Sequence, residues 1–324
     1  MNALEIYINQ FKKLRRAPGG VWDEATKNRA PHKPVLLLAV LDLVARGGIT
    51  TPFVSINGDL VELNELFNLY WRRIVAVGQT SSMAFPFSRL HNEPFWKLVA
   101  APGQQITAAA INNISTVSQL RAIAMGAQID ENLFNYLQQP ESRTALRETL
   151  LRSCFSDSAR IALADQAVLN NEAYNYSQEL AKTAHLPKVQ EILGEYRPAA
   201  RDQGFRRIIV SIYDHRCALC GVRIITPEGH TVVDAAHIIP WSRSKNDDVR
   251  NGMALCKLCH WAFDEGMMGV SETYDVLTSR QIATTPNVPG FLLTLAGRNI
   301  ITPADRDFWP NQQYLTAHRQ EWRL

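Results

Sequence analysis

Four of the five cysteines fall into two short pairs whose spacing is typical of a metal site. Cys217 and Cys220 form one Cys-x-x-Cys pair, Cys256 and Cys259 form the other, and 35 residues separate the pairs. Two such turns can supply the four tetrahedral sulfur ligands that zinc accepts, so we predict a structural Zn²⁺ site without an open position. The alternative is four buried free thiols. The fifth cysteine, Cys154, is expected to pack inside a helix.

Three polar side chains near these cysteines could together hydrolyse a phosphodiester bond. His237 lies in a β-branched, apolar run that we expect to form a strand, Asn251 precedes a glycine in a predicted tight turn, and His260 follows the last cysteine of the quartet. A neutral imidazole can take a proton from water near pH 7. A divalent cation, Mg²⁺ or Mn²⁺, can stabilise the charge that develops on the phosphate. An asparagine amide can hold the histidine in position.

This segment resembles an HNH nuclease domain of the ββα-metal type, over residues 205–275. The matching stretches are Ala235–Pro240 (AAHIIP), Asn251-Gly252, Leu255–His260 (LCKLCH) and Phe263-Asp264. The resemblance implies that His237 is the general base, that Asn251 orients the hairpin and the scissile site, and that His260 helps to hold the divalent cation.

The carboxylate that would accompany His260 is left open by the sequence. Many HNH domains carry an aspartate directly before the first histidine, but this chain has Ala236 there. Asp234 lies three residues before His237, and on a regular strand such residues face opposite sides, so Asp234 can be a ligand only if the strand bulges or twists. Asp264, one helical turn after His260, is the other candidate, although it fits equally well as an ordinary exposed acid.

Basic residues gather near the N-terminus. The net charge of the chain is only +3, but the stretch from Lys12 to Lys33 holds seven basic residues against two acidic ones. Arg29, His32 and Lys33 come just before Val35–Ala45, which we expect to be a buried helix, and a helix N-terminus favours an anion. These residues are candidate phosphate contacts, and the alternative is an ordinary capped helix with solvated charges beside it.

Residues 1–150 resemble the sulfur-binding domain of phosphorothioate-dependent restriction endonucleases. The matching stretches are Pro31–Leu38, Phe85–Leu90 and Phe95–Leu98. That family reads DNA in which sulfur replaces a non-bridging phosphate oxygen, through a shallow apolar pocket with a basic rim. The resemblance implies that His32 and Lys33 contact the DNA backbone and that Phe85 and Pro86 form part of the pocket. We add Arg29, Ser88 and Arg89 as candidate DNA-binding residues. An apolar patch gains by contacting sulfur and loses by desolvating an anionic oxygen, which makes such selectivity physically reasonable.

The expected fold class is α+β, in a chain whose 324 residues suggest two domains. We predict a reader domain of mixed helices and sheet at 1–152, a helical linker at 153–203, and an HNH nuclease domain with a C-terminal extension at 204–324. The composition, 46% hydrophobic and 20% charged, is ordinary for a globular protein. The longest uncharged apolar run has seven residues, so we expect no membrane association, no signal peptide and a cytoplasmic location.

The sequence therefore predicts a modification-dependent (type IV) restriction endonuclease that binds double-stranded phosphorothioate-modified DNA and cleaves it nearby. Its expected cofactors are a structural Zn²⁺ and a catalytic Mg²⁺ or Mn²⁺. Because one such site cuts one strand, a homodimer is expected for a double-strand cut. The alternatives are an HNH endonuclease that reads methylated or unmodified DNA, a catalytically inactive zinc-stapled DNA-binding protein, and a toxin-like nuclease with no modification requirement.

Overall fold

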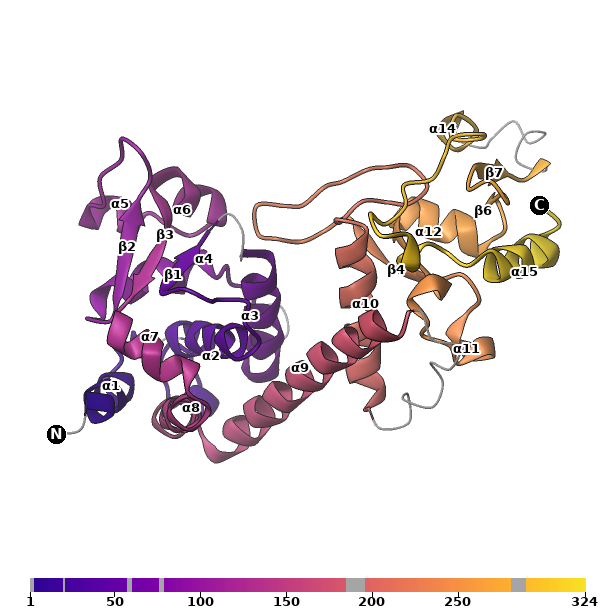
Figure 1. Ribbon diagram of the computed structural model, residues 1–324. Coiled ribbons are helices and arrows are strands. Elements are labelled where there is room, and N and C mark those ends of the chain that lie inside the picture. Colours follow the sequence, from indigo (N-terminus) through magenta and orange to yellow (C-terminus); the bar gives the residue numbers. More distant parts are fainter. Residues whose placement is uncertain (1–2, 20, 57–59, 76–78, 185–195, 281–289) are drawn as a thin grey trace. The chain divides into compact units, whose positions relative to one another are not determined.

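The computed structural model describes residues 3–19, 21–56, 60–75, 79–184, 196–280 and 290–324 and separates the chain into two compact units. The first comprises Met1–Asn170 with Thr226–His230, and the second comprises Asn171–Ile225 with Thr231–Leu324. Both contain helices and strands (Figure 1), which confirms the predicted α+β class. The predicted domain limits stay a prediction, and residues 185–195 of the expected linker lie outside the described residues.

The N-terminal unit combines a helical core with a three-stranded antiparallel sheet whose strand order is β1-β3-β2 (Figure 1). Its elements are α1 (Ala3–Lys12), η1 (Glu24–Thr26), α2 (His32–Ala45), β1 (Phe53–Ser55), α3 (Leu60–Ile74), α4 (Ala84–Arg89), η2 (Leu90–Asn92), β2 (Trp96–Ala100), α5 (Ala108–Asn112), α6 (Val117–Ile123), β3 (Ala124–Ile129), α7 (Glu131–Gln138) and α8 (Pro140–Cys154). Helix α9 (Asp157–Thr183) begins in this unit and ends in the other.

Helix α2 is the centre of the N-terminal core. Every residue from Lys33 to Val44 is buried, because the helix is apolar on nearly all sides and can be stable only when enclosed. It packs against α3, α4, α7 and α8. The predicted helix at Val35–Ala45 is confirmed, but it begins earlier, at His32, with Pro34 in the first turn, where its missing N–H costs nothing. His32 and Lys33 are therefore held in place by the core helix itself.

The C-terminal unit contains a two-stranded sheet followed directly by a helix, which is the expected ββα arrangement. Its elements are α10 (Pro198–Ile212), β4 (Val233–His237), α11 (Trp241–Ser244), η4 (Val249–Asn251), β5 (Gly252–Cys256), α12 (Lys257–Asp264), β6 (Met268–Val270), β7 (Val276–Thr278), α14 (Gly290–Leu293), η5 (Arg306–Phe308) and α15 (Gln312–Trp322). Strands β4 and β5 are antiparallel, with Val233 opposite Cys256 and His237 opposite Gly252. Helices α10 and α12 both pack against this pair.

Among the residues described, no helix combines the length and the apolar character that crossing a bilayer requires.

Gly252 is needed for close packing and not for the tight turn that the sequence suggested. Its backbone is extended, with φ at −127°, and it opens strand β5. A Cβ atom at this position would lie 2.9 Å from Phe205 Cζ and 2.9 Å from Ile209 Cγ1. The missing side chain therefore lets helix α10 approach the strand pair directly opposite His237.

Replacing Gly252 with alanine should lower the free energy of unfolding by roughly 1–3 kcal/mol, because the added methyl group overpacks the contact with α10. The control is Gly290→Ala, since a Cβ at Gly290 has nothing within 4 Å; its effect should stay within about 1 kcal/mol. Urea denaturation of the two variants checks this, and equal stabilities would contradict the packing role of Gly252.

Candidate functional site

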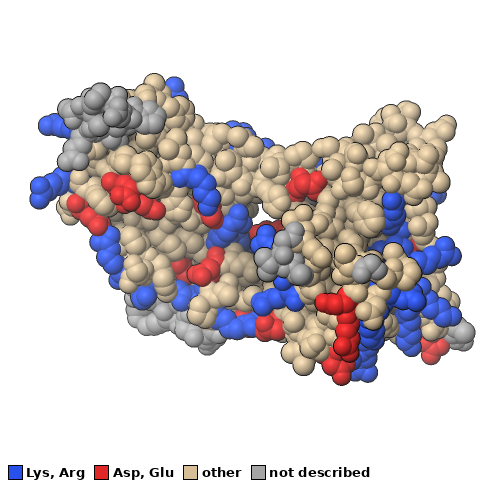
Figure 2. Space-filling view, turned by 180° about the vertical axis from the view of Figure 1, so that it is seen from behind, with Lys and Arg blue, Asp and Glu red and all other residues tan. Residues whose placement is uncertain are grey.

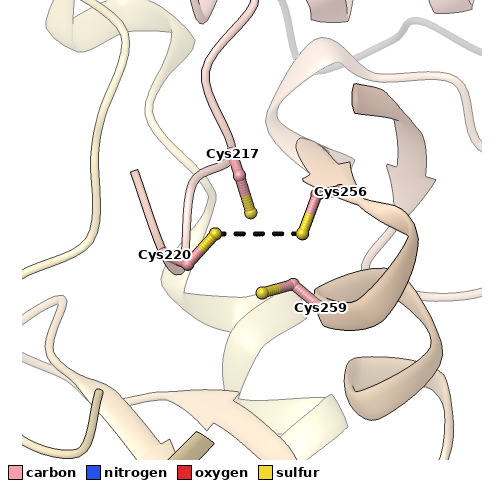
Figure 3. Close-up of side chains that lie close together, drawn as sticks. All are labelled: Cys217, Cys220, Cys256 and Cys259. Atoms are coloured by element: carbon pink, nitrogen blue, oxygen red, sulfur yellow. Dashed lines mark hydrogen bonds between the residues drawn. The ribbon is translucent and has the colours of Figure 1, made fainter. Parts of the chain in front are cut away.

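The four paired cysteines converge in the C-terminal unit (Figure 3). Their sulfur atoms all lie within 4.8 Å of one another, and Cys220 Sγ is 3.8 Å from Cys256 Sγ. Four thiolates around one zinc ion, with Zn–S bonds of about 2.3 Å, place their sulfurs about 3.8 Å apart. The quartet therefore fits a structural zinc site of the predicted kind, while Cys154 is buried apart from it, in α8.

His237, the last residue of β4, is held from two directions. Its ring lies flat against Phe205 of α10, with the centroids 4.0 Å apart and the planes at 5°. Its Nε2 atom is 2.8 Å from Oδ1 of Asp247. The side chain keeps 22% of its surface exposed, so the ring is fixed and also accessible.

Asp247, the partner of His237, was missed by the sequence reasoning. Its residue is only 3% exposed, and its Oδ2 accepts hydrogen bonds from the Tyr176 hydroxyl at 2.7 Å and from the Arg201 guanidinium at 2.8 Å. Burial acts to raise the pKa of Asp247. The hydrogen bonds from His237, Tyr176 and Arg201 outweigh burial, so the net shift of this pKa is downward. The carboxylate is therefore ionised at neutral pH.

Asn251 holds the loop that follows the histidine strand. It is fully buried, its Oδ1 accepts from the Ile239 N–H at 2.9 Å, and its Nδ2 donates to the carbonyl oxygens of Ile239 (3.1 Å) and Asn246 (3.0 Å). The amide thus restrains backbone two residues beyond His237 and does not touch the ring.

His237 and His260 share one cavity of about 290 Å³ with Asp264. The other lining residues are Ala235, Ile238, Pro240, Trp241, Arg243, Phe263, His318, Glu321 and Trp322. His260 Nε2 lies 3.5 Å from Asp264 Oδ2 across one turn of α12. Burial raises the pKa of Asp264, and the nearby His260 opposes that shift. An imidazole and a carboxylate facing one cavity are suitable donors for a divalent cation.

Asp234 is not part of this cavity. It forms ion pairs with Arg206, at 2.9 Å, and with Lys257, at 3.5 Å. The pairing of β4 with β5 runs without a shift in register, so Asp234 and His237 face opposite sides of the sheet. The structure therefore gives no support to the prediction that Asp234 joins His260 at the cation, because that role requires a bulge in β4 and the strand pairing shows none.

A second cavity, of about 590 Å³, lies in the N-terminal unit and brings together most of the predicted DNA-binding residues. It is lined by Lys13, Leu14, Arg15, Arg16, Ala17, Arg29, Ala30, His32, Lys33, Phe85, Pro86, Arg89 and Asn92. None of these lining residues is acidic. Figure 2 shows Lys and Arg side chains gathered on one face of this unit, at the right. Ser88 is fully buried and donates to the Phe85 carbonyl, so it does not face the cavity.

Three of the cations at this cavity already have partners inside the protein. Arg16 Nη1 donates to the Thr26 and Cys154 carbonyl oxygens, at 3.1 Å each. Lys33 Nζ lies 2.5 Å from Glu93 Oε1, with both side chains buried; burial lowers the pKa of Lys33, and Glu93 opposes that shift. Arg89 donates to the Ile111 and Asn112 carbonyl oxygens at the end of α5. Lys33 and Arg89 therefore shape the cavity, and the exposed lining cations are others: Lys13, Arg15 and Arg29.

His32 is a neutral, aromatic part of the cavity wall. Burial lowers its pKa to about 4, so the ring carries no charge at neutral pH. Its centroid lies 4.7 Å from that of Trp71, 5.0 Å from that of Phe85 and 5.2 Å from that of Trp22. The wall around Phe85 and Pro86 is consequently apolar, as a pocket for sulfur would need.

Two family models match the chain, and they confirm both resemblances. One, described as "ScoMcrA-like, DNA sulfur-binding domain", matches residues 9–172. The other, described as "HNH endonuclease", matches residues 217–271. A search of curated proteins returns no match.

Two solved structures are similar at low sequence identity. The "Modification dependent TagI restriction endonuclease" is 20% identical over 36% of each chain with a TM-score of 0.28, so the chain spans about a third of its length. The "Type IV phosphorothioation-dependent restriction endonuclease ScoMcrA" is 11% identical over 98% of this chain and 99% of its own, with a TM-score of 0.32. The sulfur-binding model covers about half of the chain, which therefore belongs to the ScoMcrA-like DNA sulfur-binding domain family and carries an HNH endonuclease domain after it.

Proposed function

We propose that this protein is a modification-dependent restriction endonuclease that binds double-stranded phosphorothioate DNA and hydrolyses phosphodiester bonds with its HNH site. The observation that carries the proposal is the succession of the two domain matches in one chain, together with a cavity of suitable chemistry in each of the two units. The proposal includes the need for a divalent cation and the choice of phosphorothioate DNA as the substrate.

The N-terminal cavity suits a modified phosphate for two separate reasons. Exposed cations such as Arg15 and Arg29 attract any DNA backbone, with an affinity that falls as salt rises. The wall formed by Phe85 and Pro86, beside the uncharged ring of His32, offers mainly apolar contact, which favours a weakly hydrated sulfur over an anionic oxygen.

The C-terminal cavity suits hydrolysis by an activated water. His237 takes a proton from water as the water oxygen bonds to phosphorus, and the bond from phosphorus to the leaving 3′ oxygen breaks. His260 and Asp264 would hold the divalent cation, Mg²⁺ or Mn²⁺, which neutralises charge on the phosphate and on the leaving oxygen. Asn251 keeps the loop after His237 in place.

Since one such site cuts one strand, we also propose that the protein acts as a homodimer for double-strand cleavage.

His237→Ala should reduce cleavage of a phosphorothioate duplex by about 10²–10⁴-fold, because it removes the general base, while DNA binding is retained. Asp264→Asn should also impair cleavage, and more Mn²⁺ should partly restore it. The matched control is Asp234→Asn, which removes a carboxylate outside the cavity and should leave cleavage unchanged. Single-turnover assays with Mg²⁺ and Mn²⁺ measure this; full activity of His237→Ala would refute the assignment.

Phe85→Ala should reduce the preference for the phosphorothioate duplex over the plain duplex, because it removes apolar wall from the cavity. Arg29→Gln should weaken binding to both duplexes by a similar factor and flatten the salt dependence, because it removes a backbone contact. Arg152→Gln, an exposed cation that does not line the cavity, is the control. Gel shifts over a salt series check this, and equal binding of both duplexes by the unmutated protein would end the sulfur hypothesis.

The purified protein should contain about one zinc ion per chain, and Cys256→Ser should lose it, together with thermal stability, because binding of the ion contributes directly to folding. Cys154→Ala, which removes the thiol remote from the quartet, should keep the zinc. Elemental analysis and thermal unfolding measure both effects; zinc retained at full stoichiometry in Cys256→Ser would contradict a four-thiolate site.

A further inference from the structure

We propose that Asp247 is a positioning residue of the nuclease site, which holds the His237 ring in the tautomer whose Nδ1 atom can accept the proton of the attacking water. This inference rests on the proposed function, because it assumes that His237 is the base. It adds a residue that neither the HNH motif nor the cysteine spacing identifies, since Asp247 lies ten residues beyond His237 in the polar loop before Asn251.

The tautomer follows from the hydrogen bond between the two side chains. Asp247 is ionised, and an ionised carboxylate can only accept hydrogen bonds. The 2.8 Å contact therefore places the proton on His237 Nε2. A neutral imidazole carries one ring proton, so Nδ1 must hold the lone pair. Of the two ring nitrogens, Nδ1 is thus the one that can act as a base.

The orientation of the ring is fixed by the same contact together with a stacked neighbour. Phe205 covers one face of the ring, and the parallel planes prevent it from tilting on that side. Rotating the ring by half a turn would exchange Nε2 for a carbon atom and leave the buried Oδ1 atom of Asp247 without its donor. Such a loss at a buried charge is costly, so the ring has one preferred orientation.

Asp247 is itself held in place by two donors on its other oxygen. Tyr176 is fully buried, and its hydroxyl donates to Oδ2; the Arg201 guanidinium donates to the same atom and lies 3.9 Å from the ring of Trp241. The ionised carboxylate is therefore compensated on both oxygens, as a buried charge must be. All of these residues belong to the C-terminal unit.

This arrangement makes the effect of an asparagine at position 247 predictable. The amide oxygen of an asparagine would face Tyr176 and Arg201, because both are donors, and its NH₂ group would then face His237. His237 Nε2 would have to accept that hydrogen bond, so the ring proton would move to Nδ1. The atom required as the base would then carry a proton, a defect that in a serine protease triad lowers kcat by about 10⁴-fold.

The test uses the full-length protein with ¹⁵N-labelled histidine side chains. Long-range ¹H–¹⁵N correlation spectra report the tautomer of each ring, and His237→Ala identifies the His237 signals. We expect the Nε2–H tautomer in the unmutated protein and the Nδ1–H tautomer in Asp247→Asn. Single-turnover cleavage by Asp247→Asn should be slower by roughly 10³-fold, with unchanged DNA affinity.

Two further variants separate positioning from folding. Asp248→Asn removes a neighbouring carboxylate of equal burial that pairs with Arg250, and it should leave the His237 tautomer unchanged. Tyr176→Phe removes one donor from Asp247 but keeps its charge, so the tautomer should persist while cleavage slows by less than in Asp247→Asn.

An Nδ1–H tautomer in the unmutated protein overturns the proposal even if Asp247→Asn does not fold. It is also overturned if Asp247→Asn retains the Nε2–H tautomer, or cleaves at the unmutated rate while His237→Ala is inactive. An unmutated protein that never cleaves DNA would instead refute the proposed function, and the tautomer measurement would still decide the role of Asp247.

Discussion

The register of the β4–β5 pair determines where the nuclease side chains lie. His237 stands opposite Gly252 at one end of the pair, and Val233 stands opposite Cys256 at the other. A slip of one residue would turn His237 to the opposite face of the sheet, away from the cavity that it shares with His260. Both ends of the pair are restrained, one by the converging cysteines and the other by the buried Asn251 amide.

The loop from Ile239 to Asn251 does more than connect the two strands. It supplies Asp247 to the histidine ring and is tied to the Asn251 side chain at two places along its length. Helix α10 closes the arrangement from the other side, with Phe205 against the ring and Arg201 against the carboxylate. The His237 ring is therefore held on its protein side and faces the cavity, which is the preorganisation that the proposed proton transfer to His237 requires.

The parts of this site that could be predicted are those encoded by short-range spacing. The cysteine quartet and the order of His237, Asn251 and His260 follow from local patterns, and alternation along a strand accounts for Asp234 and His237 facing opposite sides of the sheet. Asp247 could not be predicted, because Asp248 beside it has the same chemistry and only tertiary packing decides which carboxylate meets the ring.

In the N-terminal unit, the burial of helix α2 could be predicted from the apolar residues that occupy nearly all of its positions. The ion pair of Lys33 could not be predicted, because its partner Glu93 lies 60 residues away in the sequence. The close approach that requires Gly252 was hidden for the same reason, since it depends on contacts with a helix distant in sequence.

The pairing of Lys33 with Glu93 has a consequence for how such a reader could evolve. In the proposed function, attraction to DNA rests on exposed side chains such as Arg29, whereas the choice between sulfur and oxygen rests on the half-buried wall around Phe85 and His32. A reader built in this way would allow mutation to tune the strength of attachment to DNA without altering the selectivity for sulfur.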